Sequence, residues 1–139
     1  MFGESGSLKR QGLISLAPEL ARSVDTACYF ISPNAPMELS GPLLGNSYQW
    51  FELDNKDPDI LYPQIIAANN SLDHFIQEKL TEFKLGYDKL IFVGFSQGAM
   101  MSLYNSIRLK QKCAGVISFS GKLIPPTDLS EEINSKPEI

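Results

Sequence analysis

The pentapeptide Gly-Phe-Ser-Gln-Gly at residues 94–98 is the feature that most constrains how this chain can fold. It follows residues 89–93, a short apolar run that is typical of a strand buried on both faces. It precedes residues 99–104, which are typical of a helix. A Gly-x-Ser-x-Gly pattern in this context predicts a nucleophile elbow, a tight turn that exposes a serine hydroxyl above a sheet. Gly94 and Gly98 are expected there because a side chain would clash where backbone lies against backbone.

Strand-type and helix-type segments alternate along the rest of the chain. The patterns predict helices over residues 11–24, 72–83 and 97–110, strands over 27–31, 89–93 and 114–118, and irregular structure over 37–59. This alternation predicts an α/β fold with a mostly parallel sheet and helices on both faces. Parallel sheets bind ligands beyond the carboxyl ends of their strands, and Ser96 follows such an end.

Composition and charge exclude several classes of protein. The chain has 139 residues, of which 43% are hydrophobic, so it suffices for a single domain with its own core. The net charge of -4 gives no basic footprint for nucleic acid. No apolar run reaches the roughly 18 residues that a membrane-spanning helix needs. Residues 1–10 and 127–139 are expected to be loosely ordered ends, and the start has no signal-peptide layout.

The two cysteines bear on the cellular compartment. Cys28 and Cys113 lie far apart in the sequence, each beside apolar neighbours. This setting predicts buried, reduced thiols rather than a disulfide, and hence a protein of the reducing cytosol.

A serine hydroxyl needs a base to become a nucleophile, and the base is usually a histidine oriented by a carboxylate. The only histidine is His74, which precedes the serine and falls on the polar face of the predicted 72–83 helix. It is therefore expected to be a solvated surface residue. The acids Asp128, Glu131 and Glu132 follow the serine but have no later histidine to orient, and a solvated tail is expected.

Residues 94–100 and 114–121 resemble segments of the phospholipase/carboxylesterase family of α/β hydrolases, which includes bacterial carboxylesterases and acyl-protein thioesterases. The resemblance extends to residues 13–17, 32–36 and 49–51, and it covers residues 11–126. It implies Ser96 as nucleophile, the Gln97 backbone N–H as an oxyanion donor, and Trp50 in a loop near the acyl pocket. It also implies acyl ester, lysophospholipid or thioester substrates and no metal or organic cofactor.

The chain also departs from the family pattern. The family begins with a strand that ends in His-Gly-x-Gly, but Glu4 and Ser5 stand where that His and Gly are expected. The family continues past its third strand with two strands that carry an aspartate and then a histidine, and these do not follow here. A complete sheet of this kind usually takes about 200–250 residues. The resemblance therefore implies an incomplete α/β-hydrolase domain over residues 1–139, which is a fragment, a disrupted gene or a reduced relative.

Three functional hypotheses remain open from the sequence. The first is a serine ester hydrolase, weak or inactive as this chain because the acid and base are absent. The second is a non-catalytic remnant or binding module. The third is an interaction protein that completes its sheet with another chain, which could also supply a base. Uncovered sheet edges and faces predict self-association.

Overall fold

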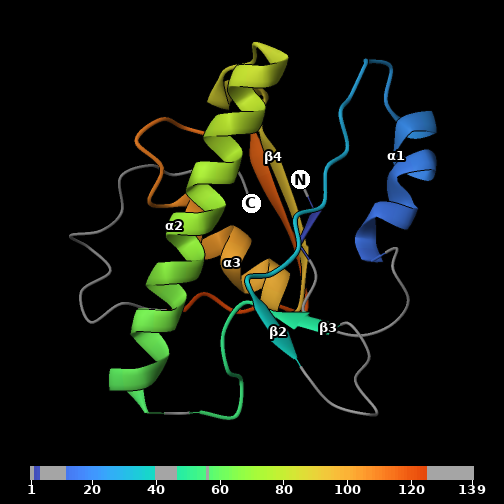
Figure 1. Cartoon of the computed structure of the whole chain (residues 1–139). Coiled ribbons are helices and arrows are strands. Elements are labelled where there is room, and N and C mark those ends of the chain that lie inside the picture. Colours follow the sequence, from blue (N-terminus) through green and yellow to red (C-terminus); the bar gives the residue numbers. More distant parts are fainter. Residues whose placement is uncertain (1, 4–11, 40–46, 56, 125–139) are drawn as a thin grey trace.

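The computed structural model describes residues 2–3, 12–39, 47–55 and 57–124 (Figure 1). In chain order its elements are β1 (Phe2–Gly3), the 3-10 helix η1 (Gly12–Leu16), α1 (Ala17–Ser23), β2 (Met37–Leu39), β3 (Ser47–Gln49), α2 (Pro58–Phe83), the 3-10 helix η2 (Tyr87–Lys89), β4 (Ile91–Phe95), α3 (Gln97–Ser106) and β5 (Gly115–Phe119). Within these ranges, no helix combines the length and the apolar character that crossing a membrane requires. The predicted loose end at 127–139 lies outside the described residues.

The main sheet is parallel, as predicted, with the order β1-β4-β5. Phe2 pairs with Val93 on one side of β4, and Phe95 pairs with Phe119 on the other. β4 begins two residues later than the predicted strand because the turn η2 occupies residues 87–89. The central position of β4 places the elbow in the middle of the sheet.

Within residues 1–10, which the sequence predicts to be loosely ordered, Phe2 and Gly3 form the strand β1. Phe2 and Gly3 pair with Val93 and Gly94, and this pairing covers part of the free edge of β4. A strand of two residues offers no alternation for a sequence pattern to detect. Residues 1 and 4–11 lie outside the described ranges.

The strand predicted at residues 27–31 is absent. This segment has no regular secondary structure and joins no sheet, and Tyr29 is 63% exposed. The Tyr29 ring stacks on Phe83 of α2, with centroids 4.0 Å apart. Cys28, predicted to be buried, is exposed, because no ladder draws this segment into the sheet; Cys113 is buried, and both thiols are free. An apolar run becomes a strand only where a partner strand is available.

The segment predicted to be irregular, residues 37–59, contains the short antiparallel pair β2 and β3. Met37 lies opposite Gln49, and Leu39 lies opposite Ser47. Strands of three residues with mixed polarity carry too little periodicity to be recognised in sequence. The pair matters because β3 leads directly into Trp50.

α2 is much longer than the predicted 72–83 helix. The Asp57 side chain caps its start by accepting a hydrogen bond of 3.0 Å from the Asp59 N–H, and Pro58 occupies the first turn. Its buried residues fall on one stripe at helical spacing: Ile65, Ala68, Asn69, Leu72 and Ile76. The helix ends at Lys84 in the left-handed conformation (φ 54°), not at Gly86 as predicted.

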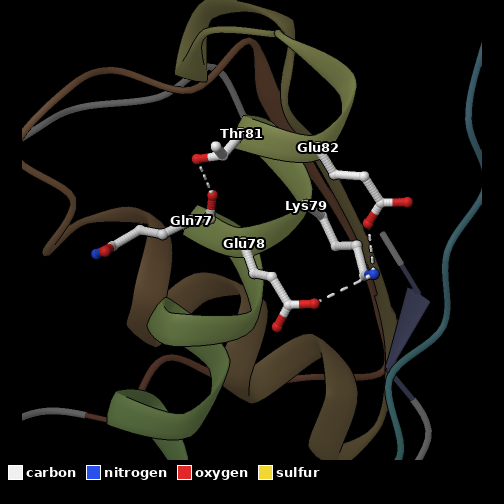
Figure 2. Close-up of polar contacts among 5 residues, drawn as sticks. All are labelled: Gln77, Glu78, Lys79, Thr81 and Glu82. Atoms are coloured by element: carbon white, nitrogen blue, oxygen red, sulfur yellow. Dashed lines mark hydrogen bonds and ion pairs between the residues drawn. The ribbon is translucent and has the colours of Figure 1, made fainter.

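The opposite face of α2 carries polar side chains, although Asp73, which the sequence pattern also predicts there, is half-buried. Figure 2 shows Lys79 between Glu82 and Glu78, at N···O distances of 2.7 and 3.5 Å, and the Thr81 hydroxyl on the Gln77 carbonyl. The hydrogen bond to Glu82, followed by the neighbouring negative charges, raises the pKa of Lys79. Such ion pairs at a surface add little stability.

The core lies between the sheet and the helices α2 and α3, which stand on the same side of it (Figure 1). Phe92 and Val116 point into this core and are 1% and 3% exposed. The predicted helix at 11–24 forms as η1 and α1, with Pro18 in the first turn of α1. α1 stands away from the sheet on the side opposite α2, and none of its residues is buried (Figure 1).

The other face of the sheet is largely open among the described residues. Four large apolar side chains on it are between 46% and 51% exposed: Ile91, Phe95, Ile117 and Phe119. They share a face for two reasons. Residues that lie opposite each other on neighbouring strands point to the same face, and every second residue along a strand points to that face as well. Isolated apolar residues on a surface are ordinary, but a contiguous patch is typical of an interaction site.

Candidate active site at the elbow

Ser96 occupies the turn between β4 and α3 with φ 52° and ψ -119°. This conformation lies outside the regions that non-glycine residues ordinarily adopt, and it costs on the order of 1–3 kcal/mol. Two backbone hydrogen bonds hold the turn: the Ser96 N–H donates to the Phe119 carbonyl (2.9 Å), and the Met100 N–H donates to the Ser96 carbonyl (3.0 Å). The side chain is only half-buried. The fold therefore maintains a strained backbone at a serine that is partly exposed.

Gly94 is required by the close approach of β4 and α3. A Cβ on Gly94 would lie 2.5 Å from the Ala99 backbone nitrogen and would also meet the Gly98 carbonyl. Both obstacles are backbone atoms of a buried helix turn, so they cannot rotate away. The absence of a side chain at Gly94 thus allows the first turn of α3 to start directly above the strand.

The backbone N–H of Gln97 lies at the first residue of α3. The first N–H groups of a helix have no intrahelical acceptor, and the helix dipole concentrates positive charge there. Such a donor next to a serine suits an oxyanion that develops during acyl transfer.

The Gln97 side chain is completely buried and spans to the segment after β3. Its Oε1 accepts a hydrogen bond from the Trp50 N–H (3.0 Å), and its Nε2 donates to the Phe51 carbonyl (2.6 Å). The amide therefore pairs with two consecutive residues much as a neighbouring strand would. Sequence reasoning assigned a role only to the Gln97 backbone and missed this bridge.

Trp50 is 3% exposed and packs in the core beneath the elbow. Its indole Nε1–H is buried and has no hydrogen-bond partner among the described residues. It borders a cavity of about 10 Å³, which also touches Pro33, Leu72, Phe92, Gly98, Met101 and Ser102. That volume is about enough for one water molecule, so this cavity is no acyl pocket.

The residues that could activate Ser96 are not gathered at the elbow in the described part of the chain. His74 is exposed on α2, as the sequence predicted. Asp128, Glu131 and Glu132 lie outside the described residues. No cluster of three metal-binding side chains occurs in the described ranges.

A buried polar cluster joins α2 to α3, and sequence reasoning missed it. The Asn105 side chain, 0% exposed, donates to Asn69 Oδ1 (3.0 Å) and to Asp73 Oδ1 (2.6 Å). Burial raises the pKa of Asp73, and the hydrogen bond from Asn105 offsets part of this rise. Burial first, and then the Asp73 charge, raises the pKa of Tyr87. The available signal was the spacing of four between Asp73 and Asn69, which lies on the stripe that α2 buries.

Because the pKa of Asp73 is raised above its ordinary 3.8, the folded protein holds this proton more tightly than the unfolded chain does. The contribution of Asp73 to stability is therefore fully present below pH 3.8 and is lost as the pH rises through the folded-state pKa. We expect Asp73→Asn to gain in free energy of unfolding relative to the wild type between about pH 3.5 and pH 7, as measured by urea titration. Glu78→Gln, at an exposed site on the same helix, is the control. A difference between Asp73→Asn and wild type that does not change with pH would contradict this expectation.

A serine in a strained turn between a central parallel strand and a helix N-terminus defines the elbow of an α/β hydrolase. Comparison with known proteins agrees. The model of the Phospholipase/Carboxylesterase family matches residues 11–139, so the chain belongs to that family.

Individual relatives give the same picture. Acyl-protein thioesterase 1 homolog 1 of Dictyostelium discoideum is 30% identical over 132 residues, which cover 88% of this chain and 54% of that protein. Acyl-protein thioesterase 1 of Saccharomyces cerevisiae is 31% identical over 109 residues, covering 76% of this chain and 48% of that protein. The crystal structure of esterase PE8 superposes with a TM-score of 0.79 at 34% identity, covering 98% of this chain and 62% of that chain. The chain thus spans about half the length of the curated relatives it matches.

Proposed function

We propose that this chain carries the nucleophile of a carboxylic-ester hydrolase that acts on acyl esters or thioesters of small molecules or lipids. The observation that carries the proposal is the strained backbone of Ser96 at the elbow. In this reaction Ser96 Oγ attacks the acyl carbonyl carbon and loses its proton to a base, while the Gln97 N–H donates to the oxyanion. The protonated alcohol or thiol leaves, and water then hydrolyses the acyl-serine to release a carboxylic acid. The family relationship supports this chemistry.

The proposal assigns different parts to the other predicted residues. Gly94 and Gly98 shape the elbow without touching substrate. Trp50, because it is 3% exposed, supports the site from beneath and leaves little surface for an acyl chain to contact. No metal or organic cofactor takes part in the proposed steps. A location in the reducing cytosol, where the two free thiols persist, belongs to the same proposal.

We further propose that these 139 residues alone react weakly. The sequence holds one histidine, His74, and it is exposed on α2. Without an imidazole at the elbow, the Ser96 hydroxyl keeps its proton and remains a poor nucleophile.

A fluorophosphonate probe tests both parts of this proposal. The probe reacts when Ser96 Oγ attacks phosphorus, fluoride leaves and a base takes the proton. We expect slow labelling of the wild type and a several-fold acceleration when imidazole is added as an external base. Mass spectrometry should locate the adduct at Ser96, and Ser96→Ala is the control. Fast labelling without imidazole would contradict the weak reactivity, whereas no Ser96 adduct under either condition in a folded chain would overturn the proposed nucleophile.

A second candidate function is an interaction module that completes its sheet with another chain. The outer edge of β5 in the described sheet and the open apolar face beside it favour this function. Its exposed side chains include Ile117 and Phe119 on β5. We expect the wild type to associate with increasing concentration in sedimentation velocity, and the double variant Ile117→Thr, Phe119→Thr to associate less. Ile66→Thr, which changes an equally exposed residue on α2, should leave association unchanged. A compact wild-type monomer at all concentrations would count against this module.

A further inference from the structure

The side chain of Gln97 has a feature that the proposed chemistry does not use. The oxyanion role needs only the backbone N–H, which any residue except proline would supply. Yet residue 97 is a glutamine whose amide is 0% exposed and bonded at both ends. Burying an amide costs free energy unless its hydrogen bonds are made, and here both are made to one backbone segment 46 and 47 residues away.

The segment that Gln97 binds, residues 50–52, is held from two sides. The Trp50 N–H and the Phe51 carbonyl bond to Gln97 of α3, while the Glu52 N–H donates to Gln64 Oε1 of α2 (2.9 Å). The Trp50 and Phe51 side chains are 3% and 2% exposed in the core. The segment therefore connects β3, α2 and the first residue of α3, next to Ser96.

We propose that the Gln97 side chain is a positioning residue, which fixes the Trp50–Phe51 segment beneath the elbow and thereby fixes the peptide that presents the Gln97 N–H. This inference rests on the proposed function, because it assigns a second role at the same site. The physical reason is geometric. A residue anchored at the end of its side chain has little freedom to rotate its own N–H away from a developing oxyanion.

The amide is matched to this task. Its oxygen accepts and its nitrogen donates at once, which the two successive backbone groups of Trp50 and Phe51 require. A glutamate in its place could still accept from the Trp50 N–H, but when ionised it could not donate to the Phe51 carbonyl. A methionine of similar size could do neither. These two substitutions separate the hydrogen bonds from the packing.

Trp50 provides a direct readout because it is the only tryptophan in the chain and is buried. We expect Gln97→Met to raise the acrylamide quenching constant of Trp50 fluorescence at least twofold. We also expect it to slow fluorophosphonate labelling of Ser96 in imidazole by roughly tenfold, less than the loss of a whole oxyanion donor. The matched control is Gln77→Met, the same substitution at an exposed glutamine of α2, which should leave labelling within about twofold of wild type.

Gln97→Glu adds a test whose expected result would not follow if Gln97 acted only through packing. Burial raises the pKa of a carboxyl group, so the introduced carboxylate should take up a proton as the pH falls from about 7.5 to about 5 and regain a donor. Trp50 quenching in this variant should then return toward the wild-type value, while the wild type and Gln97→Met show no such change. This variant also keeps the test open if Gln97→Met does not fold.

Each outcome bears on a separate claim. Unchanged quenching and labelling in folded Gln97→Met would overturn the positioning role. Raised quenching with unchanged labelling would show that the bridge holds the segment but does not influence Ser96, which also overturns the proposal. Absence of a Ser96 adduct in the wild type would overturn the proposed function and any role of Gln97 in the reaction. The quenching data would then decide only whether Gln97 holds the segment.

Discussion

Gly94→Ala is expected to lower the free energy of unfolding by about 3 kcal/mol, the upper end of the usual cost of inserting a methyl group into a packed site. The new Cβ would lie 2.5 Å from the Ala99 nitrogen and would also meet the Gly98 carbonyl, so α3 would have to move away from β4. Urea unfolding followed by circular dichroism measures the loss. We also expect labelling of Ser96 to disappear, because the turn that presents it would be displaced.

Gly86→Ala is the matched control for this prediction. A Cβ on Gly86 would meet only the Asp88 carboxylate, which lies at the end of an exposed side chain and can move aside. The φ of Gly86 is -90°, which alanine adopts readily. This substitution should change stability by less than about 1 kcal/mol. If the two alanine variants were equally stable, the close packing at Gly94 could not be the reason for its glycine.

Ser96→Gly is expected to abolish labelling and at the same time raise the free energy of unfolding by about 1 kcal/mol. Relief of the strained φ of 52° should contribute about 1–3 kcal/mol, and the greater freedom of glycine in the unfolded chain should offset part of it. Ser96→Ala should abolish labelling equally but keep the strain, because it keeps Cβ. Thermal and urea unfolding of the two variants isolate the strain from the loss of the hydroxyl.

The comparison between these two variants decides whether the elbow stores strain. A glycine variant no more stable than the alanine variant would mean that the backbone of Ser96 is relaxed in solution. Proteins often give up stability at reactive positions, and this pair of variants measures how much this chain gives up.

The elbow and the C-terminal half of α2 could be predicted from the sequence because their signals are local. The elbow is indicated by a serine between two glycines after an apolar run. The helix is indicated by apolar residues at helical spacing up to residue 83. Both signals depend only on residues close together in the sequence. The start of α2 was missed although Asp57 and Pro58 are a good cap. Pro63 and the asparagine pair at 69–70 weaken the helical pattern there. The strand predicted at 27–31 was wrong because its formation depends on a partner strand that a local pattern does not reveal.

The side-chain hydrogen bonds of the site could not be predicted from the sequence, because they too join residues that are far apart in the chain. The Gln97 bridge joins residues 46 and 47 positions apart, and Asn105 bonds to residues 36 and 32 positions away. Polar side chains such as Asp73 are assigned to a solvated face by default, and only the packing of α2 on α3 shows that a carboxylate lies between them. Contacts of this kind follow from the fold, so they can be identified only after it.

The hydrogen bond from the Ser96 N–H to the Phe119 carbonyl has a consequence for the order of folding. It joins the turn to the last residue of β5, so the strained conformation of Ser96 gains this support only after β5 has docked beside β4. Parallel strands pair across a long connection, and such contacts close late because the chain between them must first be ordered. The reactive turn should therefore be among the last parts of the molecule to form and among the first to relax when the edge of the sheet opens.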